Sequence, residues 1–337
     1  MKRPRPILTA RRLALCCLGF LALLFVALAI GISFGSGGVS PADLWGEGIE
    51  DQHRAILLQI RIPRVLMAAL LGGALSIAGV GFQALLRNPL ADPYVLGVSG
   101  GASIGGVIAL TLIKLPQPLL VPLFAFAGAL GALFLIERIA TVGGRMSVYT
   151  VLLTGAIFNA FSAAFIYFIQ SLASLEELHS IVFHLMGRVR EMELAWVGGF
   201  AVVVLIPATL LATQGRAFNA LATGEEGATQ LGVDIERLKR RTFVLGALLT
   251  GVAVAMAGLI GFVGLVVPHL LRLWFGPDHR LLLPVGFLGG ATFLVFADTL
   301  ARTVTAPNEL PVGVVTALVG GPFFLMLLRR RGATHGF

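Results

Sequence analysis

Residues 214–241 read QGRAFNALATGEEGATQLGVDIERLKRR and form the longest polar run in an otherwise apolar sequence. Apolar segments long enough to cross a bilayer lie on both sides of this run. Apolar residues recur in it at helical spacing, with glycines between two groups: Phe218, Leu221 and Ala222, then Gly224 and Gly227, then Ala228, Leu231 and Ile235. The pattern predicts two short amphipathic helices separated by a glycine break. Such an element is either a solvated loop or a docking surface for a partner, and the rest of the chain decides between them.

The composition identifies the class of protein. Apolar residues make up 57% of the 337 residues and charged residues 12%, and a soluble protein would carry roughly twice that charged fraction. The sequence therefore predicts a polytopic, all-α membrane protein. The net charge of +8 does not indicate nucleic-acid binding, because the basic residues lie at the ends of apolar segments, where membrane orientation explains them. Cys16 and Cys17 are adjacent in the first apolar run and suit neither a disulfide nor a metal site.

Ten apolar segments are expected to cross the membrane. The first, 13–32, is too long for the core of a signal peptide, so we expect a retained helix. The run 242–275 would span about 50 Å as one helix, against a hydrocarbon core of roughly 30 Å. We expect it to break into two helices near Gly258, Gly261 and Gly264. The other seven segments are 65–86, 95–113, 119–136, 148–170, 194–213, 281–300 and 312–328.

The basic residues predict the orientation of these segments. Ten crossings place both termini on one side, and that side collects 18 of the 25 Lys and Arg residues while the other collects 7. The positive-inside rule makes the richer side cytoplasmic, so both termini and the 214–241 loop are expected in the cytoplasm. The seven basic residues on the outer side are Arg54, Arg61, Arg64, Lys114, Arg188, Arg190 and Arg302.

Ionisable residues are almost absent from the interior of the segments. The main exception is Asp298, with Arg302 one turn on as its expected partner. Proton-coupled carriers and channels usually need more buried polar groups than this. The P-loop pattern GxxxxGK[ST] is also missing from the sequence. The chain is therefore not expected to be an enzyme, no catalytic residues are assigned, and another chain must supply the energy for uphill transport.

Two of the segments share a weak internal sequence similarity. Gly72 and Gly79 stand seven residues apart in LLGGALSIAG, as Gly251 and Gly258 do in LLTGVAVAMAG. The two segments would cross the membrane in opposite directions, so this similarity predicts an inverted repeat of the kind found in transporters.

Four long runs resemble one protein family. They are RIPRVLMAALLGGALSIAGVGFQALLRNPLADPYVLGVSGGASIG (61–105), LATGEEGATQLGVD (221–234), GLIGFVGLVVPHLLRLWFGPDHRLLLP (258–284) and ADTLARTVTAPNELPVGVVTALVGGPFFLMLL (297–328). In this order, and over nearly the whole chain, they resemble the FecCD family, the membrane permeases of ABC importers for ferric siderophores, haem and cobalamin.

The resemblance implies a single permease domain over residues 1–337 with the ten-helix, type II ABC importer fold. It also implies a homodimer in the bacterial inner membrane, with the translocation path along the dimer axis. Two cytoplasmic ATPase subunits and a periplasmic or lipid-anchored substrate-binding protein would complete the transporter. No cofactor or metal is expected in this chain, because ATP would bind the partner subunit.

By the same resemblance, the two short helices of 214–241 fit a cleft on the ATPase subunit and transmit its closure. Their apolar stripe suits a groove, and a glycine hinge suits two helices held at a fixed angle. The residues expected to couple the chain to the ATPase are Phe218, Leu221, Gly224, Glu225, Glu226 and Leu231.

On the outer side, the resemblance implies arginines that meet acidic residues on the two lobes of the binding protein. The motif RIPR places Arg61 and Arg64 at the mouth of the second helix, with Pro63 in its first turn, and Arg302 lies at the end of the ninth. The alternative is that these are interfacial arginines with Asp298 as a partner.

The same resemblance implies that the pathway runs along the fifth helix, 148–170, and the following segment LEELHSIVFHLMGRV. The residues expected at the pathway or its cytoplasmic gate are Ser147, Val148, Tyr149 and Asn159. The Val148–Tyr149 pair departs from the small hydroxyl residues that cobalamin permeases have at the gate. His179 and His184 are expected on the outer side, either as hydrogen-bonding surface residues or as ligands of the substrate.

Two other classes of protein stay open. A secondary carrier of a small solute would explain ten helices and an inverted repeat, but it would not need the 214–241 loop. A receptor or assembly scaffold would explain docking, but not a gated glycine-rich bundle. Co-purification of an ATPase subunit separates the importer from both. The substrate also stays open between siderophore, haem and cobalamin, because specificity in this family lies largely in the binding protein.

Overall fold

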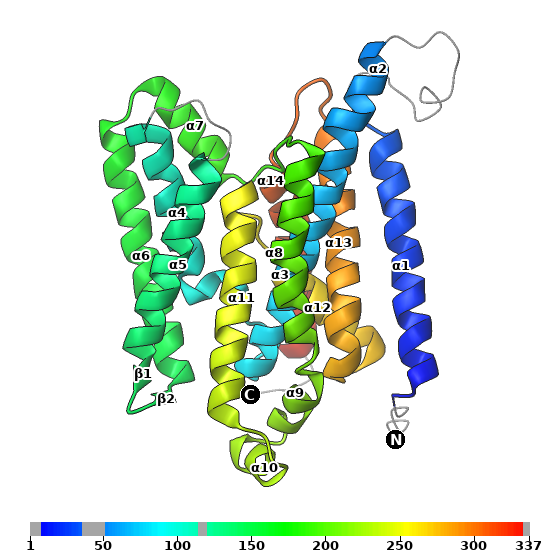
Figure 1. Cartoon of the computed structure of the whole chain (residues 1–337), viewed down its shortest axis with the longest axis vertical. Coiled ribbons are helices and arrows are strands. Elements are labelled where there is room, and N and C mark those ends of the chain that lie inside the picture. The colour runs from blue at the N-terminus through cyan, green and yellow to red at the C-terminus, as the bar shows by residue number, and fades with distance from the viewer. Residues whose placement is uncertain (1–7, 36–50, 114–119, 333–337) are drawn as a thin grey trace.

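Residues 8–35, 51–113 and 120–332 are described by the computed structural model, and they form a bundle of helices (Figure 1). Seven helices in these ranges are long and apolar enough to cross a membrane. They are α1 (Ala10–Ser33), α3 (Ile62–Leu85) with the turns before it, α5 (Leu120–Ala140), α6 (Val148–Leu172), α8 (Leu194–Ala212), α11 (Ile235–Ala257) and α13 (His279–Thr303).

Three shorter apolar helices complete the ten expected segments: α4 (Val98–Ile108), α12 (Val263–Phe275) and α14 (Val312–Gly332). A π-helical turn, Ala109–Ile113, extends α4. The chain is therefore a multi-pass membrane protein, as its composition predicts. Lys2, Arg3, Arg5 and Lys114, which entered the orientation argument, lie outside the described residues.

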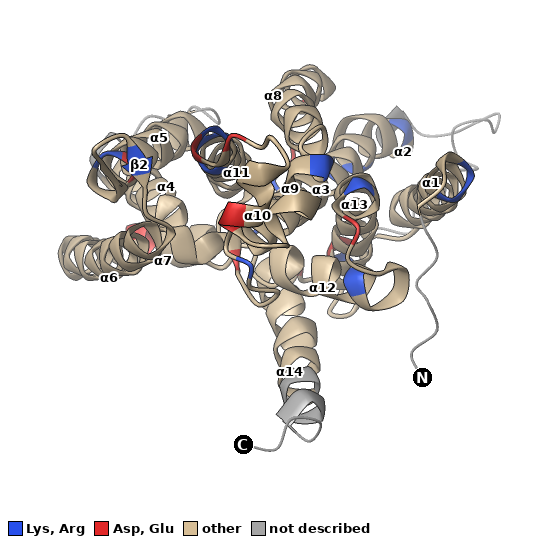
Figure 2. Ribbon diagram, turned by 90° about the horizontal axis from the view of Figure 1, so that it is seen from below, with Lys and Arg blue, Asp and Glu red and all other residues tan. Residues whose placement is uncertain are grey.

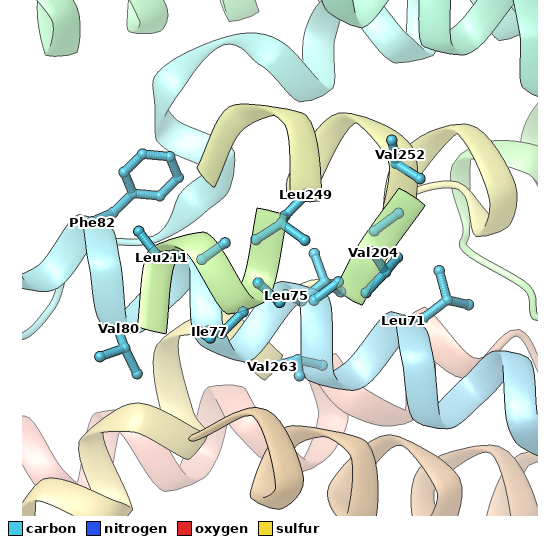
Figure 3. Packing of buried hydrophobic residues seen from close by; sticks show 14 of the residues in the cluster. Leu71, Leu75, Ile77, Val80, Phe82, Val204, Leu211, Leu249, Val252 and Val263 are labelled. Carbon is cyan, nitrogen blue, oxygen red and sulfur yellow. The ribbon is translucent and has the colours of Figure 1, made fainter. Parts of the chain in front are cut away.

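Helix α3 forms the centre of the bundle. It is enclosed by α8, α11, α12 and α13, and nearly every one of its residues is buried (Figure 3). Its glycines explain the close packing. A Cβ atom on Gly72 would collide with the carbonyl oxygen of Gly290 in α13, and one on Gly79 with that of Gly264 in α12. Lipid supplies no hydrophobic drive between helices, so their association depends on such close backbone approach.

The second crossing begins earlier than the sequence predicts. A short helix α2 (Asp51–Ala55) and a π-helical turn (Ile56–Arg61) run directly into α3. The expectation that Arg61 and Arg64 stand at a helix mouth is therefore wrong, because both lie inside one continuous helix. Pro63 is tolerated there because it is the second residue of α3, directly after the π-helical turn that ends at Arg61 and interrupts the regular pattern of hydrogen bonds.

Two breaks in the long helices meet inside the bundle. Residues 258–262 separate α11 from α12, as predicted, with left-handed backbone at Gly258 (φ 71°) and Phe262 (φ 69°). A second break before α4 contains the 3-10 turn Pro93–Leu96. The Tyr94 hydroxyl joins the breaks, since it donates to the carbonyl of Ile260 and accepts from its N–H, both at 3.0 Å. A long helix, a break and a short helix thus occur twice in the described chain, while the inverted repeat itself stays a prediction.

The remaining elements lie at the two ends of the bundle (Figure 1). One end, here called the α7 end, carries α2 and α7 (Leu175–Leu185). The opposite end, called the α10 end, carries α9 (Gly215–Leu221), α10 (Glu225–Gln230) and the hairpin of β1 (Thr141–Val142) and β2 (Arg145–Met146). In that hairpin Thr141 pairs with Met146, and it connects α5 to α6.

Candidate functional site

The stretch 214–241 folds as two short helices followed by the start of α11, which confirms the predicted helix pair. Gly224 separates α9 from α10 and adopts φ 106°, a conformation that glycine reaches without strain. The two helices project beyond the bundle (Figure 1), and α10 presents acidic residues when the molecule is viewed from below (Figure 2).

The apolar stripe of this pair faces the chain's own core. Phe218 and Leu221 are each 1% exposed, and Ala228 is fully buried. These side chains therefore anchor α9 and α10 to the bundle and do not lie open to fill a groove on a partner. Glu225, Glu226 and Leu231 are exposed, Leu231 by 68%. Of the six expected coupling residues, these three offer accessible surface.

A polar contact that the sequence did not reveal fixes α9 to the turn before α13. The Asn219 side chain donates to Asp278 Oδ1 at 2.7 Å and accepts from the His279 N–H at 2.8 Å. The Arg280 guanidinium also bonds Asp278, at 2.6 Å. These hydrogen bonds, that of Arg280 foremost, lower the pKa of Asp278 to about 2 despite partial burial. Asp278 therefore remains an anion at the base of the helix pair.

At the α7 end, the predicted pair of Asp298 and Arg302 is confirmed, with Arg302 Nε donating to Asp298 Oδ2 at 2.9 Å. Asp298 also accepts from Arg64 at 3.1 Å, although the two residues lie 234 positions apart. This contact agrees with the alternative interpretation, in which Asp298 is a partner of these arginines. Arg64 in turn donates to Glu309 at 2.8 Å. One carboxylate thus joins two guanidinium groups from α3 and α13.

The three arginines expected to meet a binding protein are all buried. Arg61, Arg64 and Arg302 are only 2–3% exposed, and Asp298 is 1% exposed. Arg61 donates to the carbonyl of Ile32 at 3.1 Å and Arg302 to that of Gly31 at 3.0 Å, which ties both to α1. Their position differs from the surface site that the RIPR motif suggested. A role in docking stays a prediction, and it would have to act through the groups around them.

Those surrounding groups are more accessible. Arg188 and Glu191 are half-exposed at this end, and Arg188 reaches Glu309 at 3.2 Å. Burial acts to raise the pKa of Glu309, but the hydrogen bond from Arg64 and the charges of Arg64 and Arg188 outweigh burial and lower it. Glu309 therefore links the buried cluster to the surface as an anion.

A cavity of about 470 Å³ lies between α4, α6 and the two helix breaks. Hydroxyl, amide and apolar side chains line it, among them Ser99, Ser103, Asn159, Ser162 and Tyr167. Asn159, expected in the pathway, holds its place by donating to the carbonyl of Tyr94 at 2.9 Å. A volume of this order is typical of small-molecule sites.

The other expected gate residues are not among those that line this cavity. Ser147 is the N-cap of α6 and accepts from the Thr150 N–H at 3.2 Å, while Tyr149 is 73% exposed. Val148 is half-buried beside them. All three lie at the α10 end, next to the hairpin, and their assignment as a gate stays a prediction.

The two histidines border a separate hollow of about 510 Å³ at the α7 end, together with Arg188 and Arg190. His179 packs on the ring of Phe183, with centroids 4.5 Å apart. His184 is buried, and its Nδ1 lies 3.3 Å from an Arg190 nitrogen. A ligand role for either histidine stays a prediction.

Known proteins are similar to this chain in sequence and in fold. The hemin transport system permease protein HmuU of Yersinia pestis is 41% identical over 319 residues, covering 93% of this chain and 95% of HmuU. The vitamin B12 import system permease protein BtuC of Vibrio vulnificus is 38% identical over 317 residues, 94% of each protein. A solved inward-facing ABC transporter of the metal-chelate type superimposes with a TM-score of 0.81 at 29% identity, covering 94% of this chain and 99% of that one.

A family match covers residues 23–330, and its description is the FecCD transport family. This range holds every membrane-spanning helix described above except the first half of α1 and the last two residues of α14. The match agrees with the four sequence runs that suggested the same family. The chain therefore belongs to the FecCD transport family.

Proposed function

We propose that this chain is the membrane permease subunit of a binding-protein-dependent ABC importer. Two copies would enclose the pathway, and two ATPase subunits would drive transport while this chain itself hydrolyses nothing. The observation that carries the proposal is the α9–α10 pair. It stands outside the bundle with Glu226 and Leu231 exposed, yet it is anchored through Phe218 and Leu221, so a force on its surface would reach the helices.

The α10 end would face the cytoplasm of a bacterial cell, with the protein in the inner membrane and both termini on the cytoplasmic side. The excess of Lys and Arg on this side of the crossings supports this orientation. The substrate-binding protein would then dock at the α7 end. Arg188 and Glu191 are exposed there, and the buried cluster of Arg61, Arg64 and Arg302 lies beneath them.

The cargo would be an iron chelate, either a ferric siderophore or haem, or else cobalamin. The names of HmuU and BtuC support this range of substrates. The cavity beside α6 supports it as well, because its hydroxyl, amide and apolar side chains suit a bulky solute that must pass without being held tightly.

Co-purification and uptake test the proposal. The chain should bring an ATPase subunit with it, and proteoliposomes that hold both should take up cargo from the binding protein only when ATP is present. Melting curves of the binding protein with haem, a ferric siderophore and cobalamin would identify the cargo. Uptake driven by a proton gradient without an ATPase subunit would contradict the proposal and favour a secondary carrier.

A further inference from the structure

Lys239 is a nearly buried lysine between the α9–α10 pair and the start of α6. Its side chain is 8% exposed, although it sits in the polar run that begins α11. A buried ammonium group is costly unless charged partners surround it. Lys239 has two such partners, and they come from different elements.

The two partners place Lys239 between α10 and α11. Its Nζ donates to Glu225 Oε2 at 2.9 Å and to Glu236 Oε1 at 3.2 Å. Glu225 is the first residue of α10, and Glu236 lies in the first turn of α11. Glu225 is one of the expected coupling residues, and the structure shows which group inside the chain it holds.

The other oxygen of Glu236 continues this connection toward α6. It accepts the backbone N–H of Met146 in β2 at 2.7 Å. Met146 is buried, and the next residue, Ser147, is the N-cap of α6. A continuous series of hydrogen bonds thus runs from α10 through Lys239 and Glu236 to Met146, two residues before the helix beside the cavity begins.

The hairpin that receives this connection has two further contacts. Arg240 Nε donates to Glu137 Oε1 at 2.6 Å and joins α11 to the last turns of α5, although the Arg240 side chain is exposed. The Ser147 N–H donates to the carbonyl of Ala140 at 3.1 Å and closes the hairpin between α5 and α6. A shift of Glu236 would therefore act on a hairpin that is closed by a backbone hydrogen bond.

We propose that Lys239 is a positioning residue that couples the α9–α10 pair to the start of α6, through Glu225 on one side and Glu236 with the Met146 N–H on the other. The inference rests on the proposed importer function. Closure of the ATPase subunits moves α10, and the four groups transmit that movement to the helix that lines the cavity. Loss of Lys239 leaves the ATPase subunits able to bind and hydrolyse ATP while α6 no longer follows.

The test uses the complete transporter in proteoliposomes, with ATP hydrolysis and cargo uptake measured on the same sample. Lys239→Met keeps the length of the side chain but removes its charge, and we expect uptake per ATP hydrolysed to fall about tenfold, within the usual range of coupling between sites. Lys239→Arg should restore most of the coupling. Arg237→Met is the matched control, because Arg237 lies half a turn away and makes only an exposed pair with Asp234 at 3.6 Å.

Measuring the distance between α10 and β2 distinguishes coupling from a purely structural role of Lys239, because a purely structural role would not change how this distance responds to nucleotide. Spin labels at Thr229→Cys in α10 and Arg145→Cys in β2, both exposed, would be placed in a background without Cys16 and Cys17. The distance distribution should stay narrow with and without nucleotide in the parent protein and should broaden with nucleotide in Lys239→Met. An unchanged distribution together with unchanged uptake per ATP would overturn the inference.

Two further variants keep the test decisive if Lys239→Met fails to assemble. Glu225→Gln and Glu236→Gln each weaken one contact of Lys239 while leaving a hydrogen-bond acceptor, and each should lower uptake per ATP on its own. Full coupling in both would overturn the inference. Failure of the importer function itself looks different, because the parent protein would then show no ATP-dependent uptake at all.

Discussion

The two ends of the bundle use the same charged residue types in opposite physical states. At the α7 end, Arg64, Arg302 and Asp298 are buried and satisfy one another inside the chain. At the α10 end, Glu226 is exposed. Among the charged residues that the structure describes at this end, Lys239 is the buried one. Burial makes the first cluster a joint between helices, whereas exposure leaves the second region accessible to the proposed ATPase partner. Substitutions at the two ends should therefore fail in different ways, the first by instability and the second by loss of assembly.

The largest expected effect is at the buried joint. Asp298→Ala leaves two guanidinium groups without their shared carboxylate, and breaking a buried ion pair costs about 3–5 kcal/mol. The melting temperature of the detergent-solubilised protein should fall clearly. Glu191→Ala is the matched control, since its carboxylate is half-exposed and 4.0 Å from Arg64, and it should change stability by less than about 1 kcal/mol. Equal melting temperatures for the two variants would remove the contrast between the ends.

The next effect separates the two faces of the α9–α10 pair. Phe218→Ala removes a buried ring and should cost about 3 kcal/mol of stability. Leu231→Ala removes an exposed side chain, so the melting temperature should not change while capture of the ATPase subunit weakens. Melting curves and pull-down of the ATPase on the same preparations distinguish the outcomes. If Leu231→Ala captures the ATPase normally, the exposed face of α10 is not the docking surface.

A smaller effect concerns docking at the α7 end. Arg188→Glu reverses an accessible charge and should slow association of the binding protein about tenfold at low salt, where screening is weakest. Its melting temperature should stay close to that of the parent protein. Arg302→Glu should instead lower the melting temperature, because it places two carboxylates side by side in a buried site. Normal melting of Arg302→Glu combined with slower docking would return Arg302 to the surface role that the sequence suggested.

The smallest effect is a pH dependence at the α10 end. The pKa of Asp278 is lowered to about 2 in the folded chain, so the unfolded chain binds this proton more readily. The stabilising effect of Asp278 is therefore complete above the unfolded pKa of roughly 4 and is lost as pH falls toward 2. The melting temperatures of the parent protein and Asp278→Asn should differ at pH 6, and the difference should narrow as the pH is lowered from 4 toward 2. A constant difference would show that the aspartate does not titrate as the contacts of Asn219 and Arg280 require.

Local patterns in the sequence predicted much of this architecture. The lengths of the apolar runs predicted the ten helices, because a bilayer of given thickness demands about 20 apolar residues per crossing. The glycine-rich run 258–264 predicted the break between α11 and α12, and the spacing around Gly224 predicted the pair α9 and α10. The pair of Asp298 and Arg302 was also within reach, since four residues on a helix bring side chains together.

The sequence did not predict which face of each helix is buried in the chain and which is exposed. The stripe of Phe218 and Leu221 is equally suited to a partner's groove and to the chain's own core, and the sequence alone does not choose. Arg61 and Arg64 look like interfacial residues because the apolar run begins just after them. The structure continues the helix outward through a π-helical turn, and it bonds Arg61 to the carbonyl of Ile32 in α1 and Arg64 to Asp298 in α13.

The sequence by itself determined that this chain is a multi-pass helical membrane protein of the FecCD family, roughly where its apolar segments lie and where the run 242–275 breaks. These properties depend on hydrophobicity, helical spacing and glycine, which act over a few neighbouring residues. Only the tertiary structure decided which charges are buried joints and which are open surfaces. Arg64 bonds Asp298, which lies 234 residues away in the chain, and Lys239 bonds Glu225, which lies 14 residues away. Glu236 accepts from Met146, which lies 90 residues away. Burial and partnership are set by packing between helices, and no local pattern records that packing.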